Sequence, residues 1–124
     1  MSKDMCGELV TRCFQARTDA HIAHLMTRSY AAHVALNEFY DGIVGLADGF
    51  AEMATGRYGI LTYPQIMPRH KDANYSKPES IPTGLRAWID SNRAECCDDS
   101  ELQNTIDEII SLCDSTIYKL KFLS

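Results

Sequence analysis

The chain has 124 residues, and its 12 basic and 17 acidic side chains give a net charge of −5 with histidine neutral. This acidic balance argues against a protein that binds nucleic acids or anionic membranes through charge alone. Hydrophobic residues make up 45% and charged residues 23% of the chain, which fits one globular domain over residues 1–124 and excludes a disordered chain.

The N-terminal segment lacks the basic run and apolar stretch of a signal peptide. No apolar run approaches the roughly 18–20 residues that are needed to span a bilayer. We therefore expect a soluble cytoplasmic protein without a membrane partner.

Helix-forming residues dominate residues 3–57 and 83–123. The first stretch is expected to break near Arg28, and Ser29 is a suitable N-cap for a second helix over residues 30–55 that ends at Gly56. Residues 58–82 hold all four prolines and predict a long crossover. A short third helix is expected over residues 83–96, capped by Thr83, and a fourth from Asp99 or Ser100 to residue 122. This order predicts an all-α four-helix bundle.

The second helix carries three distinct strips when it is projected at about 100° per residue. The predicted core stripe consists of Leu36, Phe39, Ile43, Leu46, Ala47, Phe50 and Met53. A glycine strip consists of Gly42, Gly45 and Gly49. Each glycine inside a helix costs roughly 0.5–1 kcal/mol relative to alanine. The strip therefore predicts that another backbone approaches closely.

The third strip is a polar arc that consists of His33, Asn37, Asp41, Asp48 and Glu52. A solvated helix face usually mixes Lys or Arg with Glu, but residues 33–53 contain neither Lys nor Arg. Imidazole, amide and carboxylate groups are ligands for iron, zinc or manganese. The alternative interpretation is a polar seam at a dimer interface that binds no metal.

The spacing of the arc restricts how a metal could be bound. His33 and Asp48 are about 22 Å apart along one helix at 1.5 Å per residue, so they cannot share a metal within one chain. Two copies that pack antiparallel about a two-fold axis would bring His21 and His33 of one subunit to Asp48 and Glu52 of the other. The pattern predicts a homo-oligomer with a site between subunits.

These positions resemble the motif of the Dps-type ferritins, the DNA-binding proteins from starved cells. That motif is His-x11-His-x3-Asp/Glu-x10-Asp-x3-Glu, and here it consists of His21, His33, Asn37, Asp48 and Glu52. The similarity is good over residues 15–57 and weaker over 99–123. The resemblance implies a ferritin-like four-helix bundle with a shortened third helix, assembled through two-fold pairs into a larger shell. It also implies protection against oxidative stress by Fe(II) oxidation with hydrogen peroxide or oxygen.

Carried over by position, the resemblance implies that His21, His33, Asp48 and Glu52 are catalytic and bind two irons per site. Asp48 and Glu52 of one subunit, with His21 of its partner, would hold the tighter iron, and Glu52 would bridge. His33 and Asn37 would support a second iron, which the neutral amide of Asn37 weakens. Other divalent metals fit the same donors.

Two further residues, His24 and Asp41, are auxiliary ligand candidates, because each lies one helical turn from a ligand position. The resemblance also extends to compact phage-encoded relatives, for which the location would be the host cytoplasm. DNA binding is not expected, because the N-terminal segment carries only Lys3 before Asp4. The competing hypothesis is a non-catalytic helical-bundle protein that binds a protein partner through residues 58–82.

The five cysteines are Cys6, Cys13, Cys96, Cys97 and Cys113. They lack zinc-ligand spacing, and a disulfide framework is not expected in a chain without a secretory signal. The adjacent Cys96 and Cys97 could bind a soft metal or react with oxidants. The interpretation we favour is that the isolated cysteines pack in the core and the adjacent pair ends a helix.

Overall fold

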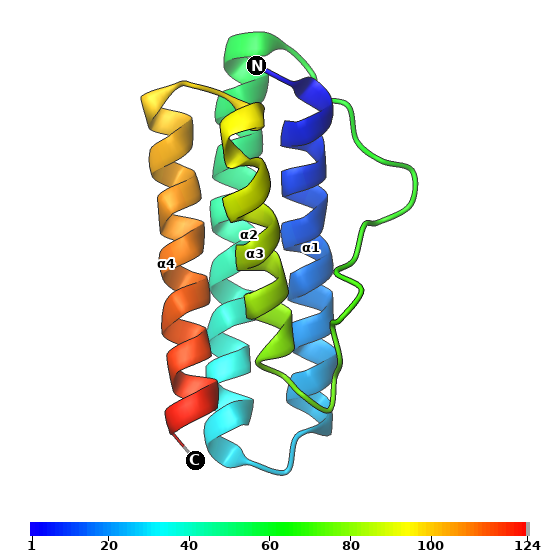
Figure 1. Cartoon of the computed structure of the whole chain (residues 1–124), viewed down its shortest axis with the longest axis vertical. Coiled ribbons are helices and arrows are strands. Elements are labelled where there is room, and N and C mark those ends of the chain that lie inside the picture. The colour runs from blue at the N-terminus through cyan, green and yellow to red at the C-terminus, as the bar shows by residue number, and fades with distance from the viewer. Residues whose placement is uncertain (124) are drawn as a thin grey trace.

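A computed structural model describes residues 1–123 and places four helices side by side (Figure 1). The helices are α1 (Lys3–Met26), α2 (Tyr30–Tyr58), α3 (Ser80–Cys96) and α4 (Ser100–Phe122). The described part of the chain contains no strand. The predicted all-α four-helix bundle is therefore confirmed.

Most predicted helix ends agree with the structure, but two caps were wrong. Ser29 caps α2 as predicted, because its side chain accepts a hydrogen bond from the backbone N–H of Ala32. The helix continues past Gly56 and ends at Gly59, whose φ of +94° is in the left-handed region that glycine adopts without strain. The third helix begins before Thr83, because Pro82 fits in the first turn, where its missing N–H has no helical partner to lose.

The crossover of residues 59–79 makes α2 and α3 run parallel. Figure 1 shows this segment leaving the end of α2 and passing along the outside of α1 before α3 begins. The helix α2 packs against α1 and α4, whereas α3 packs against α4 and α1. The two parallel helices therefore occupy opposite corners of the bundle, and one face of α2 points away from the core.

Two contacts fasten the crossover to α1. The carboxylate of Asp19 is almost fully buried and accepts hydrogen bonds from Arg69 Nε at 2.9 Å, Gln15 Nε2 at 3.1 Å and Tyr75 Oη at 3.2 Å. A Cβ added at Gly7 would lie only 1.9 Å from the backbone oxygen of Thr62. The absence of a side chain at Gly7 therefore lets the crossover backbone lie directly on α1.

The core runs along the bundle axis. Among the residues predicted for the core stripe of α2, five are buried: Leu36, Phe39, Ile43, Ala47 and Phe50. Leu46 is half-buried, and Met53, which is 38% exposed, was wrongly assigned to the core. Met53 is rotated by about 80° from Ile43 around the helix axis, which turns it out of the interior. All five cysteines are buried free thiols, so the core interpretation of the cysteines is confirmed.

Candidate functional site

Three histidines gather where α1 and α2 meet their connecting turn. The ring of His24 stacks on the ring of His33 with centroids 3.6 Å apart, and the ring of His21 stacks on Tyr40 at 4.2 Å. These contacts arise because the short turn over residues 27–29 sets α1 and α2 antiparallel. The structure thus places His24, an auxiliary candidate, in contact with His33, a principal candidate.

His24 and His33 fix each other through reciprocal hydrogen bonds to the backbone. His24 Nδ1 lies 2.7 Å from the carbonyl oxygen of His33, and His33 Nδ1 lies 2.9 Å from the carbonyl oxygen of His24. Because a carbonyl oxygen only accepts, this network assigns the donated proton to Nδ1 in both rings. In the neutral rings, Nε2 then keeps its lone pair. Metal-binding histidines are commonly oriented by such a bond from their second nitrogen.

Asn37 is held between a donor and an acceptor on its own helix. The hydroxyl of Tyr40 donates to Asn37 Oδ1 at 2.6 Å, and Asn37 Nδ2 donates to Asp41 Oδ2 at 3.0 Å. The candidate ligand Asn37 and the auxiliary candidate Asp41 are therefore in direct contact. Sequence reasoning missed Tyr40, although its spacing of three residues from Asn37 places both on one helix face.

Asp48 and Glu52 lie one turn apart on the exposed face of α2. Within residues 1–123, neither carboxylate has a hydrogen bond or an ion pair. Some surface carboxylates are paired with cations, such as Glu38 with Lys119 and Asp107 with Arg93, whereas others, such as Glu108, are unpaired in the described chain like Asp48 and Glu52. Asp48 and Glu52 therefore present oxygen atoms to solvent that no cation of the described chain neutralises.

The candidate site consists of two separate halves within one chain. The imidazole half contains His21, His24 and His33, and the carboxylate half contains Asp48 and Glu52 further along α2. The described residues contain no cluster of three or more His, Cys, Asp or Glu side chains that could hold a metal. One chain therefore supplies the donor groups but does not bring the two halves together.

The glycine strip lies open beside these halves. Apart from the adjacent backbone of α2 itself, a Cβ at Gly42 would approach only the side chain of Leu112, at 3.2 Å, and a Cβ at Gly45 or Gly49 would meet no atom of the described chain within 4 Å. No other backbone of the described chain therefore approaches the strip, and the approach of a backbone from a second copy stays a prediction. The outer face of α2 thus has room for a neighbour between its two polar halves.

The protein is an all-α four-helix bundle in which the outer face of α2 is not covered by the rest of the described chain. Residues 24–120 match a family of unknown function, DUF5856, and the chain belongs to this family. The match includes four of the five principal candidate positions and begins after His21. Neither a curated protein nor a solved structure matches the chain. Among the described helices, none combines the length and apolar character needed to cross a membrane.

Proposed function

We propose that this protein is a Dps-like iron-binding protein that oxidises and sequesters Fe(II) at sites shared by two copies of the chain. The observation that carries this proposal is the division of the outer face of α2 into an imidazole half and a carboxylate half. The rings of His24 and His33 keep Nε2 available as a donor, and Asp48 and Glu52 have no cation partner within residues 1–123. Each half lacks the ligands that the other half supplies.

An antiparallel pairing of two α2 helices would complete both halves at once. If a two-fold axis crosses α2 between Gly42 and Ile43, His33 of one copy lies at the same height along the helix pair as Glu52 of the other. Asn37 of one copy then lies at the same height as Asp48 of the other. The open glycine strip next to this axis lets two helices approach closely. A two-fold axis creates two equivalent sites, each with carboxylates from one copy and imidazoles from the other.

The donor set fits Fe(II) as a substrate, because imidazole nitrogen and carboxylate oxygen are ordinary ligands of ferrous iron. Two Fe(II) ions would each lose one electron, and one molecule of hydrogen peroxide would accept both electrons to give two hydroxide ions. In this proposal Asp48 and Glu52 hold the tighter iron, with His21 of the partner subunit. The neutral Asn37 makes the second position weaker.

The test is an anaerobic Fe(II) titration of the metal-stripped protein by calorimetry. We expect about one or two irons per chain, with one the result if Asn37 limits the second position. Binding should be lost in Glu52→Ala and kept in the matched control Glu108→Ala, which removes an exposed carboxylate of α4. The proposal fails if the wild-type chain binds no Fe(II), or if Glu52→Ala binds iron as tightly as the wild type.

A second candidate function is supported by the apolar side chains of the crossover. Ile60 and Ile66 are 79% and 85% exposed, and Met67 is 40% exposed. This surface favours a helical-bundle protein that binds a protein partner through residues 58–82. The Fe(II) titration separates the two candidate functions. Iron binding by the wild type that is unchanged in Ile66→Asp supports iron as the substrate. A chain that binds no Fe(II) would turn attention to a partner of the crossover.

A further inference from the structure

Three of the five cysteines meet at the end of the bundle where α1 begins and α3 ends. Cys6 lies at the end of the first turn of α1, Cys96 is the last residue of α3, and Cys97 is its C-cap. The side chains of Cys6 and Cys96 are fully buried, and Cys97 is 3% exposed. The thiol of Cys6 donates to the carbonyl oxygen of Cys96 at 3.4 Å. Residues 90 positions apart thus come into direct contact.

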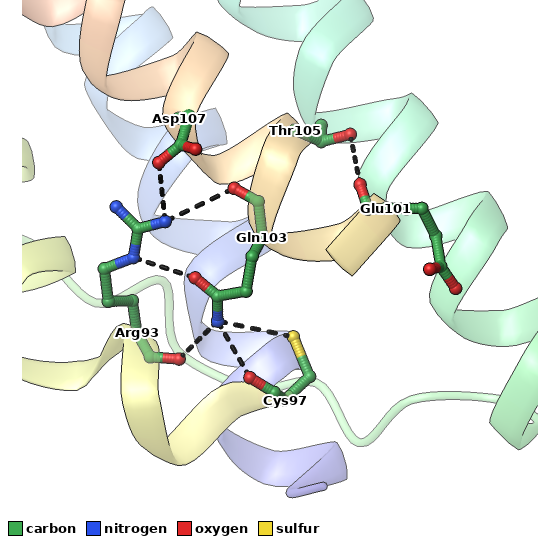
Figure 2. A network of polar contacts seen from close by, with 6 residues as sticks. All are labelled: Arg93, Cys97, Glu101, Gln103, Thr105 and Asp107. Atoms are coloured by element: carbon green, nitrogen blue, oxygen red, sulfur yellow. Dashed lines mark hydrogen bonds and ion pairs between the residues drawn. The ribbon is translucent and has the colours of Figure 1, made fainter. Parts of the chain in front are cut away.

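Two sets of hydrogen bonds hold this end of the bundle in place. The backbone N–H of Ser2 donates to the same carbonyl of Cys96 at 3.0 Å, which joins the start of α1 to the end of α3. Figure 2 shows Gln103 reaching back from α4, where its Nε2 donates to the carbonyl oxygens of Arg93 at 3.0 Å and Cys97 at 2.8 Å. The Cys96–Cys97 segment is therefore fixed on both sides and faces Cys6.

The thiol of Cys6 differs from the other four in its electrostatic surroundings. Side-chain hydrogen bonding with Cys96 lowers the pKa of Cys6, although burial raises it. A hydrogen bond with Cys97 and the positive charge of the N-terminus lower this pKa further. Hydrogen bonding to Cys6 raises the pKa of Cys96, and burial raises that of Cys97 to about 11. Burial also raises the pKa of Cys13, and raises that of Cys113 to about 12. Cys6 is therefore the one cysteine of the five whose pKa is lowered rather than raised.

We propose that Cys6 and the adjacent Cys96 and Cys97 form a peroxide-reactive thiol site, in which oxidation joins Cys6 to one of the adjacent pair by a disulfide between α1 and α3. Cys13 and Cys113, which are equally buried, are not part of this site. The proposal does not depend on iron binding, because none of the candidate iron ligands lies among these three residues.

The reaction requires hydrogen peroxide as the oxidant and proceeds in two steps. The thiolate of Cys6 attacks one oxygen of the peroxide, the O–O bond breaks, and hydroxide leaves and takes up a proton, which gives water and a sulfenic acid on Cys6. The sulfur of Cys96 or Cys97 then attacks the sulfur of Cys6, the S–O bond breaks, and the hydroxide leaves as water with the thiol proton. Two thiols and one peroxide become one disulfide and two water molecules.

Opening of the first turn of α1 gives peroxide its route to Cys6. That turn depends on Ser2, whose side chain accepts from the N–H of Met5 at 3.1 Å and whose own N–H binds Cys96. Terminal turns open at a small cost in free energy compared with global unfolding. The variant Ser2→Ala, which loses the side-chain cap, should therefore be oxidised faster at Cys6 than the wild type.

The test treats the metal-stripped full chain with hydrogen peroxide, blocks the remaining thiols by alkylation, and maps linked peptides by mass spectrometry. We expect a peptide that contains Cys6 joined to the 96–97 pair, and reduced Cys13 and Cys113. The linked peptide should vanish in Cys6→Ser and persist in the matched control Cys13→Ser. Stripping the metal separates this result from any peroxide chemistry of iron.

A second measurement covers the case in which Cys6→Ser does not fold. In the native wild type, a thiol-alkylating reagent should label Cys6 faster than Cys13 or Cys113, because Cys6 lies in the first turn of α1 and its pKa is lowered, whereas theirs are raised. The proposal is overturned if peroxide links Cys96 only to Cys97, if no linked peptide forms, or if Cys6 and Cys13 are labelled at equal rates.

Discussion

The side-chain amide of Asn37 makes two hydrogen bonds of opposite direction, because its oxygen accepts one from the hydroxyl of Tyr40 and its nitrogen donates one to the carboxylate of Asp41. We predict that Asn37→Asp lowers the free energy of unfolding of the metal-free protein by about 1 kcal/mol, since two carboxylates then face each other at adjacent turns. The same change should add a second Fe(II) per chain in the calorimetric titration. Urea denaturation with and without metal checks both effects.

The matched control for this prediction is Asp41→Asn, which removes the negative charge next to Asn37 and leaves Asn37 itself unchanged. It should add no second iron. If Asn37→Asp also fails to bind a second metal, position 37 does not limit that site, and the assignment of Asn37 as a ligand position is wrong.

The sequence could predict which residues share the polar arc of α2, because helical spacing alone determines that. It could not predict the reciprocal bonds of His24 and His33, because these depend on the register between α1 and α2. The role of Tyr40 was missed for a similar reason. Its hydroxyl donates to Asn37 and so helps to orient that amide, a contact that depends on side-chain rotamers.

At the scale of the helices, two glycines that both lie inside a helix differ in how closely other parts of the chain approach them. Gly7 lies under the backbone of Thr62, whereas Gly45 faces open space within residues 1–123. We predict that Gly7→Ala destabilises the protein by about 1–3 kcal/mol, because the crossover backbone must move. Gly45→Ala should stabilise a monomeric chain by about 0.5–1 kcal/mol, because alanine lowers the conformational entropy of the unfolded chain.

Urea denaturation at low protein concentration measures both variants under the same conditions. Equal effects of the two substitutions would mean that the crossover does not lie on α1 at Gly7. A destabilising Gly45→Ala would mean that a neighbour already covers the outer face of α2 at that concentration.

Helix boundaries were predictable to within a few residues, because a serine cap or a proline affects the backbone hydrogen bonds of residues close to it in the sequence. The packing of the crossover was not predictable, because its partners lie far away in the sequence. Asp19, for example, is buried in the structure because Arg69 and Tyr75 of the crossover pack against it and donate hydrogen bonds to its carboxylate. Long-range pairs of this kind leave no periodic pattern that sequence reasoning could use.

At the scale of the whole molecule, the proposed pairing of two chains can be tested without metal. We predict that the wild type forms a dimer whose fraction rises with concentration in sedimentation velocity, and that Gly45→Arg remains monomeric. Arginine is a good helix former, and Gly45 faces open space in the described chain, so this variant should keep its fold. It places a long charged side chain where the second helix would lie.

The matched control is Ile66→Arg, which changes the exposed crossover and should dimerise like the wild type. A wild type that stays monomeric at every concentration would contradict the shared site. A dimer that survives Gly45→Arg but not Ile66→Arg would place the interface on the crossover instead.

The crossover also has a consequence for how the chain assembles. Short turns close α1 with α2 and α3 with α4, so the molecule is two helical hairpins docked side by side. Each hairpin gains local contacts before the longer connection closes, and the entropy of that closure grows only slowly with its length. Docking of the hairpins is then the late event in folding. Residues 64–67 form an exposed part of the crossover, where a protease can cut the native chain while both hairpins stay whole.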